Sequence, residues 1–405
     1  MLGKELLKEI IESQRKWILT VKTGIKREKL QEIKIRKTFV LVVSGIRRCG
    51  KSTFLNQVSK LQRTFYYLNL EDPRLNGFEL NDFNRVDEIF KELYGKGGVY
   101  FFDEIQNIKQ WEKFIRYIAD KGEKIMITGS NASLLSRELG TRLTGRHLTT
   151  ELFPFSYREF LSFLNLNPSF ESYEKFLFKG GFPEYLGGEN VEILNELLND
   201  VLMRDIAVKF GIKNTQILKK LAIYLITSVG KEFSYNKLKK IFNIKSVQTC
   251  IDYISYFEDA YLVFSVPKFS YSYKKQQISP KKIYSIDNGF SSANSFSFSK
   301  DKGKMLENSV FLELRKKYKN IFYFQEENEC DFIIKYREKI IKAIQVCYDL
   351  NEDNKTREIN GLRKAMKKFN LNQGIILTFN QEDEINVDEG KILILPVWKW
   401  MAKKK

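Results

Sequence analysis

The sequence predicts an α/β fold, and three observations lead to this prediction. A run of branched apolar residues at 39–44 is typical of a buried strand, and a glycine-containing loop and a helical segment follow it. A second apolar run, residues 99–102, ends in Asp103 and Glu104. Residues 124–128, KIMIT, read as a third strand, which Gly-Ser-Asn follows. Short apolar strands that alternate with helical segments are typical of the α/β class.

The loop after the first strand reads GIRRCGKS and fits the pattern G-x-x-x-x-G-K-[ST]. Its position between a strand and a helix makes it a phosphate-binding candidate. Gly45 and Gly50 let the backbone turn its N–H groups toward an anion, and the helix N-terminus adds partial positive charge. Lys51 can reach the β- and γ-phosphates, and the Ser52 hydroxyl can bind Mg²⁺. We therefore expect ATP and Mg²⁺ here.

The strand that ends in Asp103 and Glu104 is the second motif. In P-loop ATPases an apolar strand with this ending places the Asp on the Mg²⁺ shell and the Glu beside the attacking water. We therefore predict Ser52 and Asp103 as metal ligands, and Glu104 with Lys51 as catalytic residues. The alternative, a strand that merely ends in two exposed acids, is weakened by the glycine loop upstream.

Polar residues after the third strand could complete the site. Ser130 and Asn131 could sense the γ-phosphate or could instead cap the next helix. Arg142 and Arg146 could supply positive charge to the transition state, or could be ordinary surface arginines. The predicted nucleotide-binding residues are Gly45, Arg48, Cys49, Gly50, Lys51, Ser52, Thr53, Asp103 and Ser130.

Composition limits the class of protein. A chain of 405 residues predicts two to four domains. A net charge of +18 favours a polyanionic partner, either nucleic acid or an acidic membrane surface, unless it reflects only a lysine-rich solvated surface. Cys49, Cys250, Cys330 and Cys347 are widely scattered and His147 is the single histidine, so a structural zinc site is not expected. The sequence shows neither a signal peptide nor a membrane-spanning run, which predicts a cytoplasmic protein that does not engage a membrane.

Motifs spread over residues 39–162 resemble those of a family of prokaryotic AAA-type ATPases. The strings are GIRRCGKST, NLEDPR, FFDEIQN, TGSNASLL, LTGR and ELFPFSYREFL. The resemblance implies a parallel P-loop sheet with an extra strand between the glycine-loop strand and the Asp-Glu strand. It also implies a winged helix and a C-terminal domain similar to PD-(D/E)XK nucleases. The expected parts are an N-terminal helical arm (1–37), the ATPase core (38–153), a helical lid and connector (154–213), the winged helix (214–290) and the nuclease-like domain (301–405).

The region expected to be a winged helix is basic. Residues 211–290 contain thirteen lysines and five acidic residues, a net charge of +8. The tip of the predicted hairpin mixes Tyr271 and Tyr273 with Lys268, Lys274, Lys275, Lys281 and Lys282. Phosphate contacts from these lysines are one interpretation. The other is a winged helix that only holds domains together, because its third helix has only Lys245 as a basic residue and carries Asp252, Glu258 and Asp259.

The C-terminal domain departs from the nuclease pattern. The matching positions are Glu307, Asp331 and the triplet Gln345-Val346-Cys347, in which Cys347 stands where the pattern has lysine. A thiol cannot stabilise charge on the phosphoryl transition state, so nuclease activity is not expected. Lys335, Lys342 or another lysine could have taken over that role.

These features predict an ATPase that couples ATP hydrolysis to domain movement and acts on or with nucleic acid. The alternative is a slow ATP-dependent switch whose C-terminal domains bind a protein partner. A third hypothesis, an ATP-regulated nuclease, is disfavoured by Cys347. A homo-oligomer remains possible, so an arginine could act within one subunit or between two.

Overall fold

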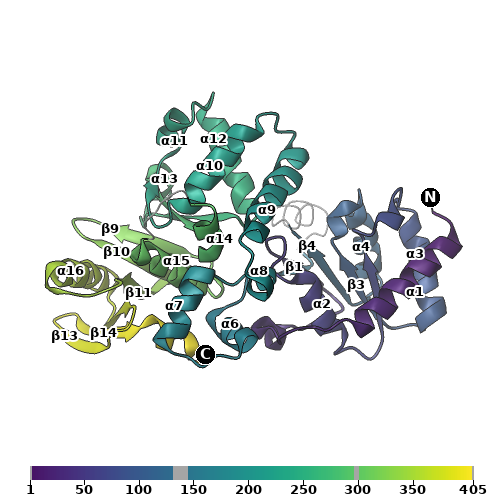
Figure 1. Cartoon of the computed structure of the whole chain (residues 1–405), viewed down its shortest axis with the longest axis horizontal. Helices are drawn as coiled ribbons and strands as arrows, with labels where there is room; N and C mark the ends of the chain where they lie inside the picture. Colours follow the sequence, from purple (N-terminus) through teal and green to yellow (C-terminus); the bar gives the residue numbers. More distant parts are fainter. Residues whose placement is uncertain (1, 131–144, 296–300, 404–405) are drawn as a thin grey trace. The chain divides into compact units, whose positions relative to one another are not determined.

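The computed structural model describes residues 2–130, 145–295 and 301–403 and divides into two compact units, residues 1–153 and 154–405. Figure 1 shows the elements of both units. Within the described part of the chain, no helix is long and apolar enough to cross a membrane.

A five-stranded parallel sheet forms the centre of the first unit, with the strand order β2-β3-β4-β1-β5. Its strands are β1 (Val40–Ser44), β2 (Phe65–Asn69), β3 (Val99–Asp103), β4 (Ile125–Gly129) and β5 (His147–Glu151). Every residue of β1, β3 and β4 is buried, as expected for central strands covered on both faces. Because β4 lies between β1 and β3, the expected extra strand and the P-loop α/β fold are confirmed.

Helices cover this sheet. They are α1 (Lys4–Thr20), α2 (Lys51–Ser59), α3 (Asp82–Tyr94) and α4 (Trp111–Asp120), with short 3₁₀ turns at Glu28–Glu32, Pro73–Leu75 and Ile105–Asn107. Helix α1 packs on β2 and α3 and buries Leu7, Ile10 and Ile11 in the core of the sheet. The side chain of Gln14 pairs with the backbone of Asn69, at 2.7 Å from its N and 3.1 Å from its O. The N-terminal helix is thus a packed part of the first unit.

The second unit begins with helices. These are α6 (Tyr157–Leu164), α7 (Phe170–Lys179), α8 (Pro183–Gly188) and α9 (Glu192–Asp200), which continues into a π-helical segment (Val201–Val208). Ser156 and Ser169 each form a capping box, which explains where α6 and α7 begin. In the break between α7 and α8, the N–H of Gly181 donates a 2.6 Å hydrogen bond to the buried carboxylate of Asp287. A residue that is distant in sequence therefore fixes this break.

The next part of the second unit consists of helices around a small antiparallel sheet, with the strand order β6-β8-β7. The elements are α10 (Thr215–Thr227), β6 (Glu232–Phe233), α11 (Tyr235–Ile241), α12 (Val247–Asp259), β7 (Val263–Pro267), α13 (Tyr273–Ile278), β8 (Lys281–Ser285) and α14 (Asn288–Ala293). The sequence predicts helices over residues 217–229, 234–242 and 246–257 followed by a hairpin, and α10, α11, α12 and the β7–β8 hairpin lie at these places. The hairpin tip, however, contains the short helix α13.

A six-stranded mixed sheet completes the second unit, with the order β13-β14-β12-β11-β10-β9. Its elements are α15 (Lys302–Arg315), β9 (Ile321–Gln325), β10 (Glu329–Tyr336), β11 (Lys339–Val346), α16 (Glu352–Phe369), β12 (Gln373–Thr378), β13 (Asp383–Val387), β14 (Gly390–Pro396) and α17 (Val397–Ala402). The sequence of this region predicts a helix, three strands, a helix and a further strand, and this is the order observed from α15 to β12. The β13–β14 hairpin and α17 were not predicted.

Candidate functional site

The glycine loop joins the end of β1 to the start of α2. Gly50 has a φ of +95°, a backbone conformation that favours glycine. Gly45 is required for a different reason, because a Cβ built on it would lie 2.1 Å from the carbonyl oxygen of Leu152. Both glycines of the pattern are therefore needed by the backbone that shapes this loop.

Arg27 supports this loop and was not identified from the sequence. Its guanidinium is buried and donates to the carbonyl oxygens of Cys49 at 2.9 Å and of Phe153 at 2.7 Å. Its backbone N–H donates to Gln57 in α2 at 3.1 Å. Arg27 thus joins the loop, the end of the first unit and α2. A lone arginine in an irregular segment gives no sequence signal for this role.

Lys51 is the buried cation of the site. Its Nζ donates to the carbonyl oxygens of Gly45 at 3.2 Å and Ile46 at 3.3 Å, and lies 3.5 Å from a carboxylate oxygen of Glu104. The loop therefore holds this ammonium beside the carboxylate predicted to act on water. A phosphate that enters the loop would meet a preorganised positive charge.

Asp103, at the end of β3, is fully buried and hydrogen-bonded to the hydroxyl of Ser52. The hydroxyl of Thr128 also donates to it, and that of Tyr67 does so at 3.4 Å. Burial and the charge of Glu104 raise the pKa of Asp103 to about 6, although the Thr128 and Ser52 hydroxyls oppose the rise. The two predicted Mg²⁺ ligands, Ser52 and Asp103, are thus in contact. A hydroxyl and a carboxylate oxygen are ligands suited to Mg²⁺.

Glu104 follows Asp103 in a left-handed conformation with a φ of +50°. Its N–H donates to the hydroxyl of Thr128 at 3.0 Å, and its carboxylate accepts from Gln106 at 2.5 Å. Burial would raise the pKa of Glu104, but the charge of Lys51 and the Gln106 hydrogen bond outweigh it, so the pKa is lowered. The carboxylate is therefore ionised at neutral pH, as a base for water must be.

Thr128 connects the two acids, and the sequence did not single it out. It lies two residues before Ser130, which is buried just beyond β4. Asn131 and Arg142 lie outside the described residues. Among the described residues, Thr128, the last but one residue of β4, is thus the polar residue that contacts both Asp103 and Glu104.

The remaining loop positions differ in exposure. The side chains of Arg48 and Thr53 are exposed, and Arg48 has a φ of +62°. The thiol of Cys49 is buried and donates to the carbonyl oxygen of Leu152 at 3.3 Å, and burial raises its pKa. A contact between Cys49 and a phosphate would therefore come from its backbone N–H.

Arg146 corrects one sequence prediction. It immediately precedes β5, and the first residue of β5 pairs with Val40, the first residue of β1. The glycine loop follows Ser44, the last residue of β1. Its guanidinium is mostly exposed and pairs with Asp120 at 2.8 Å. Arg146 thus lies at the edge of the sheet opposite the loop, and cannot act as a catalytic residue on the nucleotide of its own chain.

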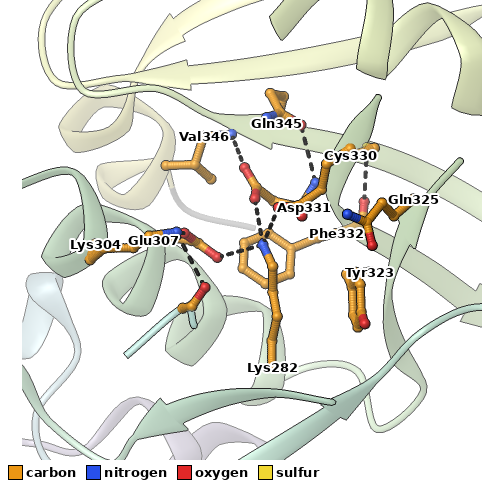
Figure 2. A network of polar contacts seen from close by, with 12 residues as sticks. Lys282, Lys304, Glu307, Tyr323, Gln325, Cys330, Asp331, Phe332, Gln345 and Val346 are labelled. Atoms are coloured by element: carbon orange, nitrogen blue, oxygen red, sulfur yellow. Dashed lines mark hydrogen bonds and ion pairs between the residues drawn. The ribbon is translucent and has the colours of Figure 1, made fainter. Parts of the chain in front are cut away.

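A second polar cluster lies in the C-terminal part of the chain (Figure 2). Lys282 of β8 is buried, with 2% exposure, and its Nζ lies 3.1 Å from Glu307, 2.9 Å from Asp331 and 2.5 Å from Glu329. Lys304 adds a second ammonium at 2.7 Å from Glu307. The predicted acidic pair is therefore brought together, but around a lysine. The prediction of Lys282 as a phosphate contact is wrong, because its charge is buried.

Backbone contacts hold the acids of this cluster. Val346 N–H donates to Asp331 at 2.9 Å, and the N–H of Asp331 donates to Gln345 at 3.1 Å (Figure 2). Gln345 also donates to Glu358 at 2.5 Å. Cys347 instead packs in the hydrophobic core with its thiol donating to the carbonyl of Asp349, and burial raises its pKa to about 11.

The lysines named from the sequence as substitutes lie elsewhere. Lys335 pairs with Glu338 at 3.8 Å, and Lys342 is half-buried on β11. The lysine that contacts both Glu307 and Asp331 is Lys282, which precedes the C-terminal domain in sequence. No group of three or more His, Cys, Asp or Glu side chains in the described ranges is placed to hold a metal ion.

Comparisons with known proteins agree with the fold of the first unit. Residues 37–161 match the family described as AAA domain, and residues 170–300 and 302–400 match two domains of unknown function. An uncharacterized protein of Methanocaldococcus jannaschii, MJ1544, is 41% identical over 401 residues, covering 91% of this chain and 89% of the relative. An uncharacterized protein of Haemophilus influenzae is 28% identical, covering 89% of this chain and 94% of the relative.

One solved structure among those similar to the chain is AMPPCP-bound DnaA from Aquifex aeolicus. The match has a TM-score of 0.28 and 13% sequence identity, and covers 64% of this chain and 89% of the DnaA chain.

Proposed function

Because the chain belongs to the same family as the uncharacterized protein MJ1544 of M. jannaschii and contains an AAA domain, we propose that it binds ATP with Mg²⁺ and hydrolyses it. One observation carries this proposal. Lys51, Ser52, Asp103 and Glu104 come from two separate strand ends, and the fold brings them into contact. This arrangement supplies a phosphate cradle, a metal-binding pair and a base.

Each of these residues has a separate role in the proposed hydrolysis of ATP. Lys51 neutralises the β- and γ-phosphates, while Ser52 and Asp103 would hold Mg²⁺, which neutralises charge on the transferred phosphoryl group. Glu104 orients the attacking water and accepts its proton. Thr128 fixes both acids, because its hydroxyl contacts the Asp103 side chain and the Glu104 backbone.

Two variants test these roles. Lys51→Ala should abolish or severely weaken ATP binding, measured by equilibrium binding of a fluorescent ATP analogue. Glu104→Gln should keep that binding but lower the hydrolysis rate about 10²- to 10⁴-fold, the usual contribution of a general base. Hydrolysis by Glu104→Gln at the wild-type rate would show that the base is another residue.

We further propose that hydrolysis moves the second unit and that nucleic acid is the partner. The net charge of +18 and the lysine-rich residues 211–290 support a polyanionic partner. In this proposal residues 214–290 act as a winged helix, and residues 301–405 keep a nuclease-like fold without its activity. ATPase rates measured with and without single- and double-stranded DNA and RNA test the partner, since a slow switch that binds a protein would show no stimulation.

The acidic cluster supports the loss of nuclease activity. A divalent metal would need the position that the Lys282 ammonium holds between Glu307 and Asp331. The expected result is no Mg²⁺- or Mn²⁺-dependent cleavage of DNA by the wild-type chain. Robust cleavage that disappears in Asp331→Ala would overturn this part of the proposal.

A further inference from the structure

The segment between β7 and β8, residues 268–281, has an unusual surface. We call it the α13 protrusion. It contains four lysines and no acidic residue. Tyr271 is 80% exposed, Tyr273 is 75% exposed and Ile278 is 74% exposed. Single exposed apolar side chains are ordinary, but three of them grouped within residues 271–278 indicate a surface that meets a partner.

Contacts with the C-terminal sheet fix the base of the α13 protrusion. The N–H of Phe269 donates to the carbonyl of Tyr323 at 2.7 Å, and the Tyr323 hydroxyl donates to the carbonyl of Pro280 at 2.8 Å. Both ends of the segment are therefore fastened to one residue of β9. The Phe269 ring packs edge-on against Phe369, with centroids 4.8 Å apart.

This anchoring extends to one of the exposed tyrosines. The ring of Tyr271 lies against Phe269 at a centroid distance of 5.2 Å and an interplanar angle of 82°. Tyr271 is thus held by an aromatic neighbour while most of its surface faces solvent. Such preorganisation lowers the entropy cost of stacking a partner on the ring.

We propose that single-stranded nucleic acid binds the α13 protrusion, with bases stacked on Tyr271 and Tyr273 and phosphates beside Lys274 and Lys275. Every base has a π-face, so exposed aromatic rings bind single strands with little sequence preference. In a duplex these base faces are stacked on one another inside the helix, so they are not accessible to the tyrosines. The lysines add an attraction that releases counterions. Because no carboxylate in the segment would repel phosphate, the charge favours a polyanion over an ordinary protein surface.

This inference rests on the nucleic-acid partner of the proposed function, but it does not depend on ATP hydrolysis. The test is fluorescence anisotropy of a labelled oligothymidylate with the full-length chain and no nucleotide. Tyr271→Ala with Tyr273→Ala should weaken binding at least about tenfold, because each lost stack removes a favourable contact. Replacing both tyrosines with Phe should restore binding, since the rings remain. Tyr117→Ala, a half-exposed tyrosine on α4, is the matched control and should bind like wild type.

The contribution of the lysines is tested separately, by the salt dependence of binding. Replacing Lys274 and Lys275 with Ala should reduce the slope of log affinity against log salt by about 1.4, that is about 0.7 per single-strand phosphate contact. An unchanged slope would remove these lysines from the binding surface.

Three outcomes overturn the proposal. They are unchanged affinity in the double Ala variant, tighter binding of a duplex of the same length, and no oligonucleotide binding by a folded wild-type chain. The last outcome would favour a protein as the partner of the exposed tyrosines. ATPase rates of the same preparations distinguish the two proposals. ATP hydrolysis without oligonucleotide binding would contradict only the proposal for the α13 protrusion. Oligonucleotide binding without ATP hydrolysis would contradict only the proposed ATPase activity.

Discussion

Replacing Lys282 with Met tests the acidic cluster, because methionine preserves much of the side-chain length and removes the charge. Removing one partner of a buried ion pair costs about 3–5 kcal/mol. Lys304 continues to compensate Glu307, whereas Asp331 is left beside the Val346 N–H, so we expect a loss of about 3 kcal/mol, the lower end of that range. For a unit of this size, about 2–4 °C per kcal/mol predicts that the melting temperature falls by about 6–12 °C.

Thermal and urea unfolding of the full-length chain measure this loss. Lys281→Met is the matched control, because Lys281 precedes Lys282 on β8 but is half-buried and lies 3.3 Å from the Tyr235 hydroxyl. We expect only a small change there. A Lys282→Met chain as stable as Lys281→Met would refute the reasoning, since it would show that the ammonium stabilises nothing.

The same pair of proteins gives a pH test with a defined sign. Burial alone would lower the pKa of Lys282, but the negative charges of Asp331 and Glu307 raise it well above its ordinary value of 10.5. A raised pKa in the folded state means that the stabilisation is fully present below about 10.5 and is lost as pH rises through the folded value. The stability difference between wild type and Lys282→Met should therefore stay constant from neutral pH to about 10 and narrow above 10.5.

Further predictions concern the nucleotide site. Thr128→Val removes the hydroxyl between the two acids and should lower the ATPase kcat about 10- to 100-fold with little change in equilibrium nucleotide binding. Mg²⁺-dependent ATP binding, followed by titration at several pH values, should weaken as pH falls through about 6, because Asp103 binds Mg²⁺ only when ionised. Gly45→Ala should destabilise the first unit by about 1–3 kcal/mol in urea unfolding, since its Cβ meets the Leu152 carbonyl. Arg146→Ala should leave the ATPase rate of a single chain unchanged, and a large loss would indicate that a neighbouring copy uses this arginine.

Much of the nucleotide site could be predicted because its residues are consecutive. The segment from Gly45 to Ser52 and the pair Asp103-Glu104 each have a fixed order and spacing on either side of a strand end. Thr128 was missed because threonine is common in strands and carries no charge. Its role depends on the contacts of its hydroxyl with the Asp103 side chain and the Glu104 backbone, which only the folded structure reveals.

Lys282 could not be predicted for a related reason. Its neighbours along the chain, Lys281 and a run of lysines and glutamines, suggest a solvated surface. The partners that neutralise it are Glu307 and Asp331, which lie 25 and 49 residues away. Sequence patterns report local periodicity, so a charge buried by residues this distant gives no local signal.

The position of Lys282 also limits how this chain can be divided into expressible fragments. One matched domain ends at residue 300 and the next begins at residue 302, so a fragment cut at that boundary retains Glu307 and Asp331 but lacks the lysine between them. Such a fragment would keep Lys304 beside Glu307 but leave Asp331 without a cation in its interior, so it should be less stable at neutral pH. Exchange of the C-terminal domain between related proteins would then succeed only when β8 is transferred with it. Residues 281–403 should therefore be exchanged as a single segment.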